Sequence, residues 1–198
     1  GYHFYALTSF FAYEKFSLHT PHSHIHHPNY KAMMELLFSY LEPGFRVPML
    51  NDTNYGHTSS IYYLYEFAYR EIGGEKLLYV LQELYKDEAR DNLEAFIYGV
   101  DELPPCSIVP TGNHIEMGSG NSILRGSDER YLLFKHDCYG GEHDHYDRLD
   151  ISYEAFGKRT APDLGTTGYG ALMHYDYYKN TGSHNTVNID GKNQAPAN

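Results

Sequence analysis

The first half of the chain has hydrophobic residues at the spacing of α-helices. Residues 29–42 (NYKAMMELLFSYLE) show this spacing, follow a proline that suits a helix start, and stop at a Pro-Gly pair. Similar patterns predict further helices over 2–17, 57–71, 75–86 and 88–98. Several helices in series with broad apolar faces predict a multi-helix layer such as a bundle or toroid.

The pattern changes near Leu103, where two prolines follow. Beyond it, short β-branched and aromatic runs alternate with Gly, Asn, Asp and Ser, which is typical of strands and turns. The predicted strands are 106–110, 114–118, 121–125, 130–137, 148–156 and 185–190. A short polar turn between 121–125 and 130–137 predicts a hairpin. The sequence therefore predicts an α+β chain with a helical domain over 1–102 and an antiparallel β-domain over 103–198.

Composition limits the classes of partner. No apolar run approaches the roughly 20 residues that a membrane helix needs. The net charge of -11 argues against nucleic acid, which needs a basic surface. A polyanionic substrate would need a local cluster of Arg, Lys, His or metal. The 21 tyrosines and absence of tryptophan fit a carbohydrate cleft, because tyrosine stacks and hydrogen-bonds, although many of them fit helix packing equally well.

Candidate chemistry gathers between residues 136 and 186. His143 and His145 are alternate residues, so extended backbone places them on one face. Asp163 precedes a Gly-rich turn, and His184 opens the last strand-like run. Two imidazoles and a carboxylate suit Zn²⁺ with an open fourth position. The same spacing is equally compatible with surface or hydrogen-bonded histidines that do not lie close together in the fold. The separate His-rich segment 21–27 favours solvated or helix-start histidines over a second metal site.

Three runs, GEHDHYDRLD, APDLGTTGYG and GSHNTV, resemble the heparinase II/III-like polysaccharide lyases, and most closely their exolytic oligoalginate branch. The resemblance implies the C-terminal part of an incomplete (α/α) toroid followed by the beginning of an antiparallel β-sandwich. We therefore expect the chain to be a piece of a longer protein. In complete members an Asn/His pair that neutralises the uronate charge precedes the tyrosine motif, so we expect this chain alone to be weakly active or inactive.

The resemblance also implies residue roles. It places His145, Asp163 and His184 as ligands of a structural Zn²⁺, with His143 facing the substrate. The opening GYHFYAL is similar to the family's tyrosine motif, which makes Tyr2 the candidate catalytic tyrosine. We expect three further residues to bind substrate, with loop packing or surface ion pairing as the alternative: Tyr169, Tyr178 and Arg148. Asp52 is expected to pack a turn.

Such lyases cleave uronate glycans by β-elimination, in which a base removes the C5 proton and an acid protonates the departing O4. The amino-acid sequences of the motifs favour alginate or oligoalginate as the anionic substrate, with heparin or heparan sulfate as the alternative. A zinc-dependent hydrolase and a non-catalytic carbohydrate-binding module are the other classes left open. The resemblance implies a periplasmic or secreted protein.

Overall fold

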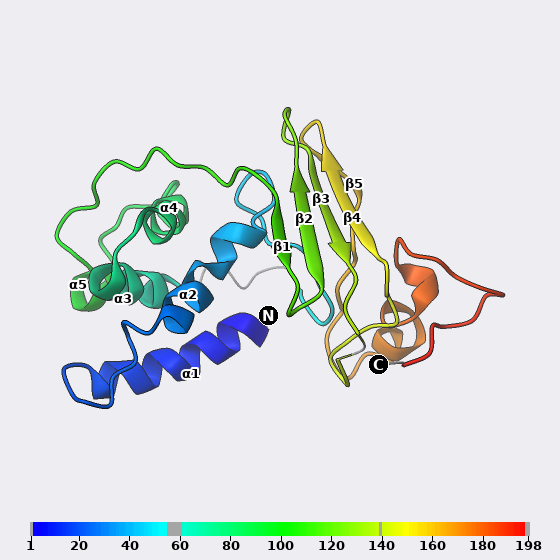
Figure 1. The fold of residues 1–198 in the computed structure, drawn as a ribbon, viewed down its shortest axis with the longest axis horizontal. Helices are drawn as coiled ribbons and strands as arrows, with labels where there is room; N and C mark the ends of the chain where they lie inside the picture. Colours follow the sequence, from blue (N-terminus) through cyan, green and yellow to red (C-terminus); the bar gives the residue numbers. More distant parts are fainter. Residues whose placement is uncertain (1, 55–60, 139, 197–198) are drawn as a thin grey trace. The chain divides into compact units, whose positions relative to one another are not determined.

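The chain forms two compact units in a computed structural model that describes residues 2–54, 61–138 and 140–196. The helical unit comprises residues 1–39 and 56–110, and the sheet unit comprises residues 40–55 and 111–198 (Figure 1). The sequence placed one boundary at residues 102–103. The two units instead divide at residues 110–111, and residues 40–55 leave the helical region to join the sheet.

All five predicted helices are present. They are α1 (Tyr2–Ser17), α2 (Pro28–Tyr40), α3 (Tyr62–Ile72), α4 (Glu75–Leu84) and α5 (Leu93–Tyr98). Residues 57–60 of the predicted third helix lie outside the described residues. No described helix is both long enough and apolar enough to span a membrane.

Local chemistry sets the helix ends. Gly73 and Gly74 follow α3 with φ angles of 66° and 110°, which side-chain-bearing residues rarely adopt, so the helix stops there. The side chain of Asn92 accepts a hydrogen bond from the backbone N–H of Ala95 at 2.9 Å and caps α5. This cap explains why α5 begins later than the predicted residue 88.

The helical unit has its own apolar core. Buried side chains come from α1 to α4 and from the loop before α2, and they include Leu7, Phe11, Ile25, Met34, Leu37, Leu64, Tyr65, Phe67, Leu77, Val80 and Leu81. Several aromatic pairs cross this core edge to face, such as Phe11 with Phe67 at a centroid distance of 5.2 Å.

The sheet unit is built on a five-stranded antiparallel meander in the order β1-β2-β3-β4-β5 (Figure 1). Its strands are β1 (His114–Glu116), β2 (Asn121–Arg125), β3 (Tyr131–Lys135), β4 (Ile151–Ala155) and β5 (Lys158–Ala161). The predicted hairpin is confirmed, since Ile123 of β2 pairs with Leu133 of β3. Ile123, Leu133 and Tyr131 form the buried core on one face.

Two strand predictions are wrong and one strand was missed. Residues 106–110 and 185–190 form no strand; the second range contributes only an isolated bridge between Ile189 and Lys192. Both runs have β-branched residues but form no ladder of strand pairs, on which strand propensity depends. In the second run, the Asn185 carbonyl accepts a single hydrogen bond from the Ile151 N–H of β4 at 3.4 Å. The missed strand, β5, reads KRTA and lacks a hydrophobic run. Helices followed by an antiparallel sheet are thus observed, while the toroid and the sandwich stay predictions.

Charge pairs and backbone bonds hold residues 40–55 in the sheet unit. Arg159 of β5 donates to the carboxylate of Glu42 at 2.9 Å, and Arg46 pairs with Glu154 of β4. Further along the segment, the Thr166 N–H donates to the Thr53 carbonyl at 3.0 Å. These contacts fix the loop between Arg46 and Thr53, on which Asp52 lies.

Candidate functional site

A single buried carboxylate organises the outer half of the candidate site. One oxygen of Asp52 lies 3.0 Å from His143 Nδ1 and 2.8 Å from the Tyr169 hydroxyl. Its other oxygen lies 3.0 Å from His145 Nε2. The Asp52 side chain is fully buried, whereas the His143 side chain is 55% exposed. The carboxylate therefore joins an exposed imidazole to a buried one.

The donors around Asp52 keep it ionised. Burial alone would raise the pKa of this carboxyl, but hydrogen bonds from His145, Tyr169 and His143 outweigh burial and lower it. The fully buried carboxylate is therefore negative at neutral pH. Lysine and arginine are not among these donors, so two imidazoles and a phenol stabilise the charge.

The inner half of the site gathers residues that bind divalent metals. Among the described residues, two overlapping groups bring ligand atoms within 4.8 Å of one another: His145, Asp147 and His184, and then Asp150, Asp163 and His184. All five side chains are buried. The rings of His145 and His184 have centroids 5.2 Å apart. Imidazole and carboxylate ligands of this kind suit Zn²⁺.

Unpartnered atoms show that the residues fit an ion. The buried atoms His145 Nδ1, His184 Nε2, Asp147 Oδ2 and Asp150 Oδ2 have no hydrogen-bond partner. A buried polar atom without a partner is costly, and metal ligation is one way to satisfy it. By contrast, both oxygens of Asp163 are engaged, by the Gly165 N–H at 2.8 Å and by His184 Nδ1 at 3.2 Å.

The buried carboxylates of this inner half lie close together, so a positive charge among them would be stabilised. Burial, together with the charges of Asp163 and Asp147, raises the pKa of Asp150 to about 7. Burial would lower the pKa of His184, but its hydrogen bond to Asp163 and the neighbouring carboxylates raise it. Burial lowers the pKa of His145, which keeps this imidazole neutral and able to ligate.

The predicted site residues are therefore only partly placed together. His143, His145, Asp163, His184 and Tyr169 meet in the sheet unit, and the histidines that spacing left open do lie together. The predicted zinc ligands divide between the two groups that share His184.

Arg148 has a different environment from the one expected of a substrate clamp. Its guanidinium donates to Asp144 at 2.6 Å and to Asp137 and Asp147 at 3.1 Å each. The side chain is 17% exposed. These contacts favour the ion-pair alternative for Arg148. The guanidinium stabilises the negative charges of these three aspartates, which lie next to the potential metal ligands.

Tyr178 and Tyr2 are the two remaining candidates. The Tyr178 ring packs edge to face on Tyr177 at a centroid distance of 5.4 Å. Tyr2 begins α1 in the helical unit and is 45% exposed. Their roles in substrate binding and catalysis stay predictions.

Sequence reasoning missed two residues of the site. It did not predict that Asp52 lies at its centre, or that His174 lies beside Asp52. His174 is buried, with Nδ1 2.7 Å from the Thr166 hydroxyl and Nε2 3.7 Å from Asp52. It lies in the π-helix η2 (His174–Tyr178). The expectation that Asp52 only packs a turn was too narrow. Nothing in the local LND sequence signals that this carboxylate meets residues about ninety positions later.

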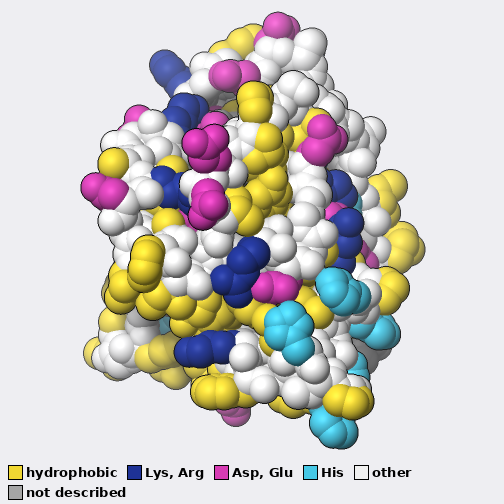
Figure 2. All heavy atoms as spheres, turned by 90° about the vertical axis from the view of Figure 1, so that its left-hand side faces the viewer, with side chains coloured by type: hydrophobic (Ala, Val, Ile, Leu, Met, Phe, Trp, Pro, Cys, Tyr) yellow, Lys and Arg dark blue, Asp and Glu magenta, His cyan; other side chains and the backbone are white. Residues whose placement is uncertain are grey.

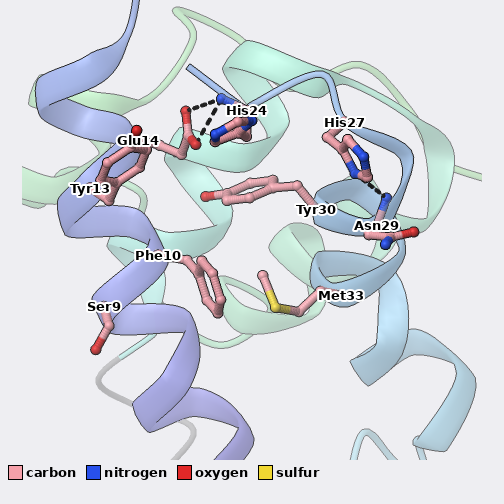
Figure 3. Close-up of a pocket in the computed structure, with 9 residues that line it drawn as sticks. All are labelled: Ser9, Phe10, Tyr13, Glu14, His24, His27, Asn29, Tyr30 and Met33. Carbon is pink, nitrogen blue, oxygen red and sulfur yellow. Dashed lines mark hydrogen bonds between the residues drawn. The ribbon is translucent and has the colours of Figure 1, made fainter. Parts of the chain in front are cut away.

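The helical unit has a pocket of about 600 Å³ between α1, α2 and the His-rich loop. Figure 3 shows Phe10 of α1 beside Tyr30 and Met33 of α2. Glu14 is tied to this loop, because its carboxylate accepts from the His24 N–H at 2.9 Å. His27 Nδ1 accepts from the Asn29 N–H at the start of α2. The hydrogen-bonding role predicted for this segment is thus confirmed for His27.

Figure 2 shows that histidine side chains gather on one part of the molecular surface, near exposed hydrophobic ones. The described residues of the His-rich segment belong to neither group of potential metal ligands. The described hydrogen bonds of His24 and His27 join this loop to α1 and to the start of α2.

Comparisons with known proteins give one family match and several similar folds. Residues 117–197 match the family model described as heparinase II/III-like, C-terminal. No curated protein matches the sequence.

Solved structures with the same fold include a heparinase III gene product, with a TM-score of 0.68, 20% identity, and coverage of 97% of this chain and 29% of the other. The heparan sulfate lyase HepC from Pedobacter heparinus gives a TM-score of 0.70 at 17% identity over 99% of this chain and 30% of the other. A further heparinase III gives 0.70 at 16% identity over 99% and 32%. The chain thus spans about 30% of the length of these structures, and its residues 117–197 are similar to the heparinase II/III-like C-terminal family.

Proposed function

We propose that the protein is a polysaccharide lyase that cleaves uronate-containing glycans by β-elimination. The observation that carries the proposal is the exposed imidazole of His143, held by Asp52 and Tyr169 beside a buried cluster of metal ligands. A half-exposed base on a rigid support is what removal of a proton from a bulky glycan requires. The match of residues 117–197 to the heparinase II/III-like family supports the same reaction class.

The residues have distinct tasks in this reaction. His143 takes the C5 proton of the uronate, or stands as its positive neighbour. Tyr2 provides the opposite proton transfer, to the O4 that leaves, and this assignment rests on the resemblance of the GYHFYAL motif. Tyr169 is 57% exposed, and its ring lies 5.9 Å from that of His143, so it lines the same surface.

The metal in this proposal is a structural Zn²⁺. His145, His184 and the carboxylates of Asp147, Asp150 and Asp163 would hold it. The ion would neutralise buried carboxylates and tie together three segments of the chain. Only Asp144 separates His143 from His145 in the sequence, so a fixed His145 also fixes the backbone that carries the base.

The substrate we propose is a heparan sulfate type of glycan. The similar solved structures are heparinase III and a heparan sulfate lyase, and they favour this alternative over the alginate that the motifs first suggested. Both glycans carry the uronate carboxylate that the chemistry needs. Since enzymes of this kind act on extracellular glycans, we also propose a periplasmic or secreted location.

The experiment uses the complete gene product, because the chain spans about 30% of the matched heparinases. It is offered heparan sulfate, heparin, polymannuronate and polyguluronate, and ultraviolet absorbance reports the unsaturated uronate. We expect absorbance to rise on heparan sulfate and to be lost in His143→Gln. The exposed loop residue His19 gives the matched control His19→Gln, which keeps activity.

A rise on alginate alone would reverse the substrate assignment. Absence of any rise, with saturated fragments formed instead, would favour the zinc-dependent hydrolase. Binding of glycan without cleavage would favour the carbohydrate-binding module.

A further inference from the structure

Asp52 faces two imidazoles at once, and its chemistry dictates their protons. An ionised carboxylate only accepts hydrogen bonds, so each ring nitrogen within hydrogen-bond distance of it must carry a proton. His143 presents Nδ1 to Asp52, and His145 presents Nε2, each at 3.0 Å. The two rings therefore bind the same group through opposite nitrogens.

For His143 the consequence is an unprotonated nitrogen at the other end of the ring. With its proton on Nδ1, the neutral ring has an unprotonated Nε2. The side chain is 55% exposed, so a ligand at the surface can reach this ring. The Tyr169 hydroxyl lies 2.8 Å from the same Asp52 oxygen and 3.0 Å from His143 Nδ1, which fixes the ring from a second side. The ring is thus a ready proton acceptor.

For His145 the consequence lies inside the protein. With its proton on Nε2, the neutral ring has an unprotonated Nδ1, and this atom is buried without a partner. His145 also belongs to the buried group with Asp147 and His184. Nδ1 is therefore the ligand atom of His145, and Asp52 is the carboxylate behind a metal-binding histidine, an arrangement that orients the ring and raises its basicity.

We propose that Asp52 is a positioning residue that sets the tautomers of His143 and His145 together, and so couples the metal site to the base. The role of His143 in this inference rests on the proposed function. The role of His145 rests only on the group of potential metal ligands that it forms with Asp147 and His184. Asp52 acts through the two imidazoles and needs no contact with the substrate.

The fold holds Asp52 rigidly enough for this role. Its neighbour Thr53 accepts the backbone hydrogen bond of Thr166, and Asn51 accepts from the buried Lys135. Gly165, with a φ of 62°, lies so close that a Cβ there would be 2.1 Å from the Thr53 carbonyl oxygen. The loop that carries Asp52 is thereby fixed on both sides of the carboxylate.

The test replaces Asp52 by Asn in the complete gene product. The amide keeps the shape of the carboxylate but presents a donor to one of the two rings, which must then change its tautomer. We expect kcat and zinc affinity each to fall on the order of 10- to 100-fold, while KM changes less than about threefold. Zinc affinity is measured by competition with a chromogenic chelator. The matched control is Asp128→Asn, whose carboxylate is 72% exposed in the turn between β2 and β3.

A second measurement needs no variant. Nitrogen-15 NMR of the histidines distinguishes the protonated ring nitrogen, and we expect Nδ1–H for His143 and Nε2–H for His145. The opposite tautomer on either ring overturns the proposal even if Asp52→Asn does not fold. Wild-type kcat and zinc affinity in a folded Asp52→Asn variant would also overturn it. A wild-type protein that cleaves none of the glycans would instead remove the proposed function, and zinc affinity and NMR would still decide the tautomers.

Discussion

Lys135 gives the sharpest test of how the site is supported. This β3 residue is 1% exposed, and its ammonium lies 2.7 Å from both Asp144 and Asp147. Burial would lower the pKa of Lys135, but the two carboxylates outweigh burial and raise it. Replacing Lys135 by Met keeps a side chain of similar shape and removes the ammonium, with its charge and its hydrogen bonds.

The magnitude follows from what the change leaves behind. Removing one partner of a buried ion pair typically costs about 3–5 kcal/mol, because the other charge stays buried. Arg148 still reaches Asp144 at 2.6 Å and Asp147 at 3.1 Å, so part of the compensation remains. We therefore expect a loss near the lower end, about 3 kcal/mol. That loss changes the folding equilibrium on the order of 100-fold.

The assay is urea unfolding followed by circular dichroism. With a slope of about 2 kcal/mol per molar, the midpoint should fall by about 1.5 M. The matched control Lys158→Met removes an exposed lysine of β5 and should shift the midpoint little. A loss below about 1 kcal/mol for Lys135→Met would refute the reasoning, because a surface ion pair is worth that much.

The pH dependence has a definite sign. Because the pKa of Lys135 is raised in the folded protein, its contribution is fully present below the ordinary lysine pKa of about 10.4 and is lost as pH rises through the folded value. The stability difference between wild type and Lys135→Met should therefore be constant through neutral pH and shrink only in strong alkali. A difference that shrinks between about pH 6 and 8 would contradict this assignment.

Three further predictions concern packing, backbone and metal. Ile123→Ala should cost about 2–5 kcal/mol in urea unfolding, because Ile123 is fully buried, whereas Leu124→Ala on the half-exposed face of the same strand should cost much less. Gly165→Ala should destabilise more than Gly168→Ala. Both glycines have positive φ, but only at Gly165 would the Cβ meet backbone; equal losses would contradict the clash. Chelator treatment should remove about one zinc per chain and lower the melting temperature; purified protein without zinc and insensitive to chelator would argue against the metal site.

The sequence predicted the elements whose residues carry their own signal. Residues 121–125 and 130–137 each contain a short apolar run beside a polar turn, and they form the β2–β3 hairpin. The strand Lys158–Ala161 has no such apolar run, and its pairing with β4 depends on tertiary context. The run 185–190 shows the reverse, with strand-like residues that form no strand.

The same distinction applies to the site. His143 and His145 could be grouped from their spacing, because extended backbone puts alternate residues on one face. Asp52 could not, because its loop reaches them only through contacts such as the Thr53–Thr166 backbone bond. Arg148 was predicted as a clamp from its chemical type alone. Its three aspartate partners become apparent only in the folded sheet unit.

The measurement that most directly tests the central claim is mass spectrometry of the products formed from heparan sulfate by the complete gene product. β-Elimination expels O4 without adding water, so we predict fragments with an unsaturated uronate at the new non-reducing end. These products are lighter by one water than hydrolysis products. Saturated fragments that carry the added water would contradict the account, because they would assign the chemistry to hydrolysis.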